Sequence, residues 1–220
     1  MTLDQQILLE RVGLYSLLRA LYSFPLTEAL LATVAGLSVE PDSPLTNPLR
    51  QMQVRLSQNE SLARTVEALN VEMTRLLEGP GLTPAPPYAS YYLHGRQLMG
   101  PAAQKVRQVY WQWQVAPDSK INLPADHLTL ELGFLAHLAQ LTAESGGEVG
   151  GVLAASRDFL RQHLWPWLPR FCAALTTASA DPFFSGLAHF TQAAIQSDLV
   201  WLEAVLNPVA VEATEVVSLN

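Results

Sequence analysis

The chain contains 220 residues, of which 49% are hydrophobic and only 15% are charged, and its formal net charge is −7. This composition indicates a globular protein with a sizeable core and excludes a disordered chain. It also argues against nucleic-acid binding, which needs a clustered basic face. The single cysteine, Cys172, excludes an intramolecular disulfide and an all-cysteine metal site. No apolar run reaches about 18 residues and the N-terminus lacks an export signal, so we expect a cytoplasmic protein with no stable membrane insertion.

Helical periodicity extends along almost the whole chain. Apolar residues recur at steps of three and four, and proline, glycine or a capping residue bounds the segments. Residues 79–87 contain too many glycines and prolines for a regular element, and Pro166 and Pro169 must kink or divide any helix that contains them. Helices are predicted over residues 4–23, 26–37, 47–57, 61–77, 101–114, 126–143, 152–178 and 182–206.

These segments predict an all-α fold, a single-domain bundle of about eight to ten helices. The bundle is expected to occupy residues 1–206, followed by a flexible tail over residues 207–220. The proline-containing loop over residues 116–124 can serve as a hinge for domain swapping, so both a monomer and a homodimer are compatible with the sequence.

The most informative stretch is the turn Pro124-Ala-Asp-His127. Asp126 is predicted to be the N-cap of the following helix, because a carboxylate accepts hydrogen bonds from first-turn amides. His127 and Glu131 are four residues apart and share one helix face, which the apolar Phe134 and Leu138 continue. A polar mouth that leads into an apolar wall is the arrangement expected of a site for an amphipathic ligand.

A second constellation is Pro86-Pro-Tyr-Ala-Ser-Tyr-Tyr-Leu93. Its prolines stiffen the backbone, and its tyrosines offer large amphipathic surfaces of the kind that bind peptides. Tyr88 and Tyr92 project together if a helical turn forms there. The alternative is that these rings pack a loop onto the bundle, which we favour for Tyr91.

No motif of a known enzyme class is present. GxSxG, HExxH and a glycine-rich phosphate loop are all absent from the sequence. Asp126, His127 and Glu131 can support a small metal- or water-using hydrolase, but no third metal ligand lies at helical spacing on that face. A further alternative is a structural adaptor in which the Asp-His turn is only a helix cap.

Several motifs together resemble the redox-enzyme maturation chaperones of the TorD/DmsD/NarJ type. The family's element close to Glu-Pro-x-Asp-His matches residues 123–127, and its Pro-Pro-aromatic-x-Ser-x-aromatic-Leu element matches residues 86–93. Leu123 stands where the family usually has Glu. Further matches are Glu78-Gly79-Pro80, Leu98-Met99-Gly100, Val106-Arg107, Tyr110, Phe159-Leu160, Leu164-Trp165-Pro166-Trp167 and Pro182-Phe183-Phe184, and they extend the resemblance over about residues 7–205.

The resemblance implies a cytoplasmic, non-catalytic chaperone, with no cofactor or metal, whose partner is the catalytic subunit of a molybdenum oxidoreductase. Such a chaperone binds the subunit's twin-arginine signal peptide or N-terminal segment until the molybdopterin cofactor is inserted. Asp126 and Glu131 are expected to meet the arginines, with the apolar run held in a groove. If His127 titrates near neutral pH, affinity will depend on pH. The predicted peptide-binding residues are Tyr22, Leu76, Pro87, Tyr88, Tyr92, Pro124, Asp126, His127, Glu131, Phe134 and Leu138.

Overall fold

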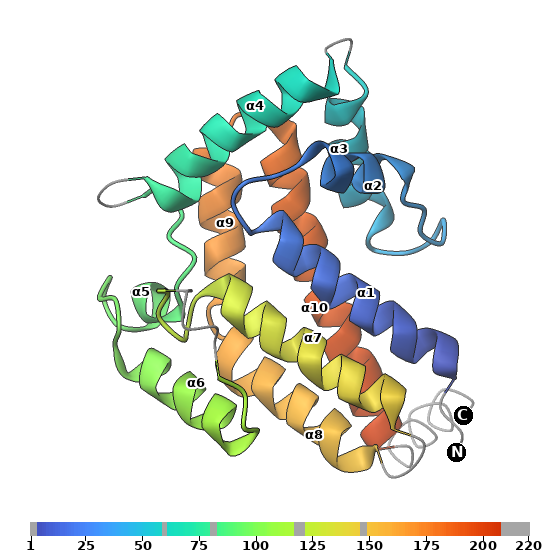
Figure 1. Ribbon diagram of the computed structural model, residues 1–220, viewed down its shortest axis with the longest axis vertical. Coiled ribbons are helices and arrows are strands. Elements are labelled where there is room, and N and C mark those ends of the chain that lie inside the picture. Colours follow the sequence, from blue (N-terminus) through green and yellow to red (C-terminus); the bar gives the residue numbers. More distant parts are fainter. Residues whose placement is uncertain (1–3, 59–60, 80–82, 117–121, 146–148, 208–220) are drawn as a thin grey trace, which may run out of the picture.

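The computed structural model describes residues 4–58, 61–79, 83–116, 122–145 and 149–207. Within these ranges the chain forms ten α-helices and no strand, which confirms the predicted all-α fold (Figure 1). Most of the predicted hinge and all but the first residue of the predicted tail lie outside the described residues. The helices are α1 (Gln5–Leu21), α2 (Glu28–Gly36), α3 (Thr46–Leu56), α4 (Leu62–Met73), α5 (Ala89–Leu93), α6 (Pro101–Gln112), α7 (Leu128–Glu144), α8 (Gly150–Phe159), α9 (Leu168–Ala178) and α10 (Pro182–Leu206).

The helices begin and end close to the predicted positions because their boundaries are set locally. The side chains of Asp4, Thr27, Ser61 and Asp181 each accept a hydrogen bond from a first-turn amide of the helix that follows. The predicted helix over residues 152–178 is divided as expected, with a turn at Trp165–Trp167 before α9. Two π-helical turns, η1 (Thr74–Glu78) and η2 (Leu160–Leu164), follow α4 and α8 directly.

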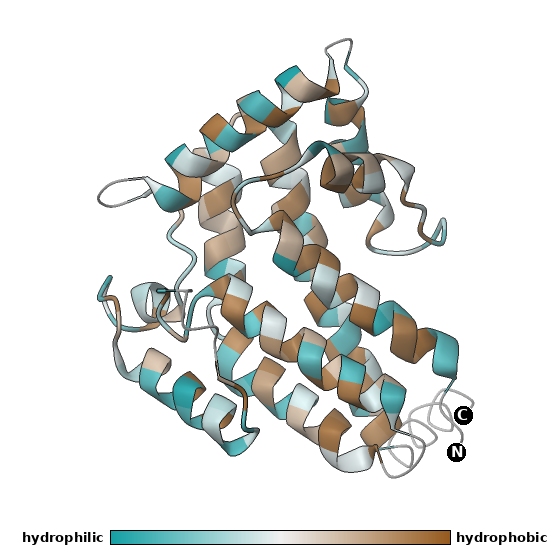
Figure 2. Ribbon diagram, in the orientation of Figure 1, coloured by the Kyte–Doolittle hydropathy of each residue, from teal (hydrophilic) through white to brown (hydrophobic). Residues whose placement is uncertain are grey.

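The helices pack as long neighbours rather than as separate lobes. α1 lies along α7, α8 lies beside α7 and α10, and α10 also packs against α3 and α9 (Figure 1). Apolar and polar positions alternate around most helices, as amphipathic helices require (Figure 2). No helix in the described part of the chain is long and apolar enough to cross a bilayer.

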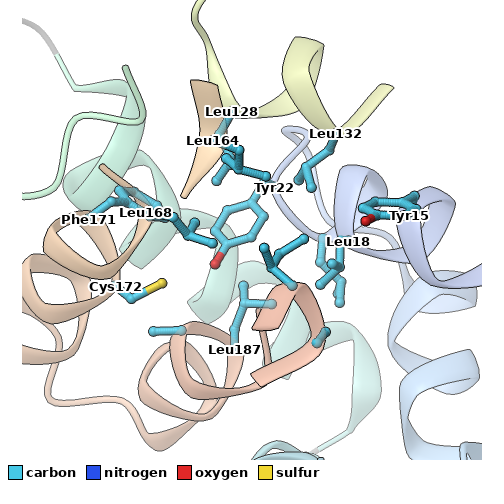
Figure 3. Close-up of a cluster of buried hydrophobic side chains, with 14 of the residues drawn as sticks. Tyr15, Leu18, Tyr22, Leu128, Leu132, Leu164, Leu168, Phe171, Cys172 and Leu187 are labelled. Atoms are coloured by element: carbon cyan, nitrogen blue, oxygen red, sulfur yellow. The ribbon is translucent and has the colours of Figure 1, made fainter. Parts of the chain in front are cut away.

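The core is centred on Tyr22 (Figure 3). Its ring lies among side chains from α1, α7, α9 and α10, and its hydroxyl shares a hydrogen bond of 3.0 Å with Thr191 on α10. Cys172 lies in the same cluster, and burial raises the pKa of its thiol to about 12, so the sulfur is an uncharged packing atom. This core fixes the first turn of α7, where the candidate site lies.

Candidate functional site around the start of α7

His127, rather than Asp126, is the N-cap of α7. Its Nδ1 accepts a hydrogen bond from the Thr129 amide at 3.2 Å and lies 2.7 Å from the Thr129 hydroxyl oxygen. The prediction that Asp126 caps this helix is therefore wrong. The turn before α7 directs the Asp126 carboxyl away from its own helix and toward α5.

Asp126 joins the two predicted motifs to each other. Its Oδ2 accepts from the amide of Ser90 at 2.7 Å and from the Ser90 hydroxyl at 2.5 Å, and its carbonyl accepts from the Ala89 amide at 3.1 Å. An isolated antiparallel bridge pairs Tyr88 with His127. The side chain of Tyr88, which immediately precedes α5, makes no capping hydrogen bond to that helix. Asp126 therefore caps the start of α5 in its place.

Ser90 extends this connection to α6. Its hydroxyl oxygen accepts a hydrogen bond from the amide of Gly100 at 3.1 Å, immediately before α6 begins. One carboxyl and one hydroxyl therefore hold the starts of α5, α6 and α7 together. The segment over residues 83–100 and the turn over residues 123–127 form a single structural unit.

The predicted polar mouth is wrong, because its three side chains are buried. Asp126 and Glu131 have no exposed surface and His127 is 1% exposed. The Tyr88 ring covers His127 edge-on at 4.8 Å, and the Trp167 indole donates to Glu131 Oε2 at 3.3 Å. The predicted apolar wall is also part of the core, since the remaining buried site residues are Tyr22, Leu76, Pro87, Phe134 and Leu138.

Burial sets the charge state of the cluster. Desolvation lowers the pKa of His127 to about 4, so the imidazole is neutral near pH 7 and does not titrate there. Desolvation raises the pKa of Glu131 well above its usual range, the Trp167 hydrogen bond lowers it, and the nearby Asp126 raises it further. Because His127 Nδ1 accepts from an amide, the imidazole proton lies on Nε2.

Several polar atoms of this cluster lack a partner among the described residues. They are Asp126 Oδ1, His127 Nε2, Glu131 Oε1 and the Tyr92 hydroxyl. Each unmade buried hydrogen bond destabilises a protein by about 1–3 kcal/mol. Buried polar atoms without partners are uncommon, and a group of them within a few residues marks a place where a ligand can supply the missing bonds.

Tyr88, Tyr92 and Pro124 are the predicted site residues that reach the surface in part. A helical turn does form in this segment, as α5, and it places Tyr92 on Trp167 with ring centroids 5.8 Å apart and planes at 19°. Pro124 and Leu123 line a cavity of about 510 Å³ against α6. Tyr88 lines a smaller cavity of about 240 Å³.

The sequence reasoning missed the contribution of α6 to this surface. Trp111 is 82% exposed and Met99 is 71% exposed, and both line the larger cavity with Tyr110. A tryptophan one position away from the buried face of an amphipathic helix was the available signal. Leu123, which stands in place of the family's usual Glu, makes this cavity more apolar.

The described residues contain no group of three histidine, cysteine, aspartate or glutamate side chains placed to hold a metal ion. Asp126, His127 and Glu131 also lie beneath Tyr88 and Trp167 and line neither cavity. A substrate in either cavity would therefore not contact the three groups that the hydrolase alternative requires.

Comparisons with known proteins give a consistent result. The family model described as "Nitrate reductase delta subunit" matches residues 40–173. The chain is 38% identical over 115 residues to the chaperone protein TorD of Vibrio cholerae, an alignment covering 51% of this chain and 52% of the relative. It is 25% identical over 205 residues to TorD of Aliivibrio salmonicida, covering 88% and 94%. The chain thus spans about half the length of the Vibrio relative that it matches.

The fold also matches that of a solved structure. A protein from Archaeoglobus fulgidus described as a redox enzyme maturation protein aligns with a TM-score of 0.52 at 22% identity, covering 83% of this chain and 92% of the other. At this identity the likeness concerns the fold, and it agrees with the predicted helical bundle.

Proposed function

Because this chain belongs to the nitrate reductase delta subunit family, we propose that it is a non-catalytic chaperone in the maturation of a redox enzyme. It acts in the cytoplasm on the catalytic subunit of a molybdopterin oxidoreductase. It binds the twin-arginine signal peptide or N-terminal segment of that subunit and assists cofactor insertion before export. The name chaperone, carried by the relatives, supports the absence of turnover.

The observation that carries this proposal is the unit formed by residues 83–100 and 123–131. It combines a partly exposed aromatic surface with buried hydrogen-bonding atoms that have no partner. In the proposed complex Tyr88, Tyr92 and Pro124 contact the peptide directly. Aromatic rings suit this role because they bury a large area and lose little conformational entropy.

The buried members of the site act from beneath this surface. A peptide main chain offers both N–H donors and carbonyl acceptors, which can pair with Asp126 Oδ1 and His127 Nε2 when Tyr88 moves aside. The elevated pKa of Glu131 assigns it a neutral hydrogen-bonding role, so Asp126 is the carboxyl proposed to meet a peptide arginine. Tyr22, Leu76, Pro87, Phe134 and Leu138 hold the unit in place.

Calorimetry with a synthetic peptide tests this proposal. The peptide carries two adjacent arginines followed by an apolar run of about twelve residues, as an export signal does. Tyr88→Ala is expected to weaken binding by about 1–2 kcal/mol, in the range of an interface aromatic residue, and His127→Ala is expected to weaken it as well. Phe24→Ala removes an exposed aromatic ring that lines none of the described cavities, so it is the control and should leave affinity within about 0.5 kcal/mol of wild type.

The outcome is interpretable only for folded variants, so each is first checked by circular dichroism. A wild-type protein that does not distinguish the arginine peptide from one with glutamates in place of the arginines would refute the proposed function. Equal affinity of wild type, Tyr88→Ala and His127→Ala would instead refute the assignment of the site.

A further inference from the structure

A second groove in the described part of the chain lies away from the start of α7, between α1, α10 and residues 37–45. Its volume is about 720 Å³, and it shares no lining residue with the cavities beside the start of α7. It forms because α1 packs mainly on α7 and α10 mainly on α3, which leaves their facing sides only lightly in contact. Its apolar lining includes Leu14, Leu17, Val39, Leu45, Phe190 and Trp201.

The groove continues along α10. Ser197 and Trp201 also line an adjoining hollow of about 570 Å³, which extends to Val200 and Ala204. Val200 is 62% exposed, so the apolar path reaches the surface of α10. A path of this shape fits a chain-like ligand better than a compact one, because successive apolar side chains can lie along it.

A buried ion pair at the base of the groove leaves one donor unused. Arg11 Nε and Nη2 bind Asp198 at 2.6 and 3.1 Å, Tyr15 donates to the same carboxylate, and the Trp201 ring centroid lies 4.9 Å from the guanidinium carbon. Arg11 is 4% exposed, and its Nη1 has no hydrogen-bond partner among the described residues. Since Asp198 balances the charge, this N–H suits a neutral acceptor such as a peptide carbonyl.

The rim of the groove is acidic. Glu10 on α1 and Glu40 in the connection between α2 and α3 are both exposed, and both line the groove. Arg11 is the one basic side chain among the described lining residues, and Asp198 balances its charge. The net field at the rim is therefore negative and favours a ligand with a positive end followed by an apolar run.

We propose that this α1–α10 groove is a second binding surface for the N-terminal segment of the client, taking a stretch in which basic residues precede apolar ones. The proposal rests on the proposed chaperone function, and it assigns part of the recognition to a different face of the molecule.

Charge reversal at the rim tests the groove with the same arginine peptide. Glu10→Lys/Glu40→Lys is expected to weaken binding about tenfold, because two attractive contacts become repulsive. Glu28→Lys/Glu67→Lys changes the net charge equally at exposed positions outside the lining and should leave affinity within about twofold of wild type. This control separates local recognition from general attraction by an acidic protein.

The apolar path is tested in parallel. Leu14→Gln places a polar amide in the groove wall and is expected to weaken peptide binding about fivefold. The control is Val71→Gln, at an exposed position of α4, which should not change the affinity. A photoreactive residue in the apolar run of the peptide should crosslink to α1 or α10, as mapped by mass spectrometry.

The outcomes separate this inference from the function on which it rests. Wild-type affinity in both groove variants, with crosslinks confined to residues 83–131, overturns the groove while leaving the chaperone proposal intact. A wild-type protein that binds no arginine-bearing peptide overturns both. Loss of binding in the groove variants, with both controls unchanged, supports the groove.

Discussion

Replacing Asp126 by alanine tests whether this carboxyl holds the starts of three helices together. The variant loses two hydrogen bonds to Ser90 and leaves the Ser90 amide, which is fully buried, without its acceptor. A hydrogen bond to a carboxylate contributes about 1.5–3 kcal/mol, and a buried amide left unpaired destabilises by about 1–3 kcal/mol. Because the variant also removes the unpaired Oδ1, we expect a net loss of about 3 kcal/mol.

The assay is urea denaturation followed by circular dichroism, with thermal melting as a second measurement. A loss of about 3 kcal/mol lowers the Tm of a chain of this size by about 6–12 °C. The control is Asp158→Ala, whose half-exposed carboxylate pairs with its neighbour Arg157, and its effect should stay below about 0.5 kcal/mol.

A double-mutant cycle with Ser90→Ala attributes the effect to the contact itself. The two substitutions should show a coupling energy of about 1–2 kcal/mol, because each removes one side of the same bond. Additive effects, or an Asp126→Ala protein as stable as wild type, would refute the view that this carboxyl organises the site. A binding defect without loss of stability would refute it equally and would favour a direct contact with the peptide.

Changes at Glu131, at His127 and at two glycines have expected outcomes. Glu131→Gln keeps an acceptor for Trp167 and should stabilise the protein by about 1 kcal/mol or more above pH 5. This gain should vanish below pH 4.5, because Glu131 is then protonated in both the folded and the unfolded state. The same dependence of unfolding free energy on pH in the variant and the wild type would contradict this. The stability that neutral His127 contributes is complete above pH 6.5 and falls by about 3 kcal/mol toward pH 4, so an NMR titration should give a midpoint near 4 rather than 6.5. Gly186→Ala places a Cβ 2.9 Å from the carbonyl oxygen of Pro48 and should destabilise the protein by about 1–3 kcal/mol in chemical denaturation. Gly13→Ala places a Cβ with no neighbour within 4 Å and should stabilise the protein by about 0.5–1 kcal/mol in the same assay.

The helices could be predicted from the sequence because their signals are local. Periodicity and capping residues such as Ser61 and Asp181 act within one or two turns, and the proline pair at Pro166 and Pro169 marks the break before α9. α5 was not predicted as a regular element, because its cap comes from a carboxyl 36 residues away. No local pattern can report such a partner.

The proximity of several candidate site residues could be predicted from the sequence, but their burial could not. Asp126, His127 and Tyr88 do lie together, as the motif resemblance indicated. Asp126, His127 and Glu131 lie within six residues of one another, which suggests an exposed polar surface. Their burial follows from the rings of Tyr88 and Trp167, which are distant in sequence. The α1–α10 groove could not be predicted from the sequence either, because it depends on which helices pack against each other in the fold.

The hydroxyl of Ser90 links Asp126 to the amide of Gly100, so one side chain couples the turn before α7 to the start of α6. Loosening of the α7 turn would release the start of α6 in the same event. The amides of Ala89, Ser90 and Gly100, all bonded within this short relay, should then exchange their hydrogens with deuterated solvent at one common rate. Binding of a peptide at the turn before α7 would thus change the environment of the exposed Trp111 on α6, which Ser90 and Gly100 connect to that turn.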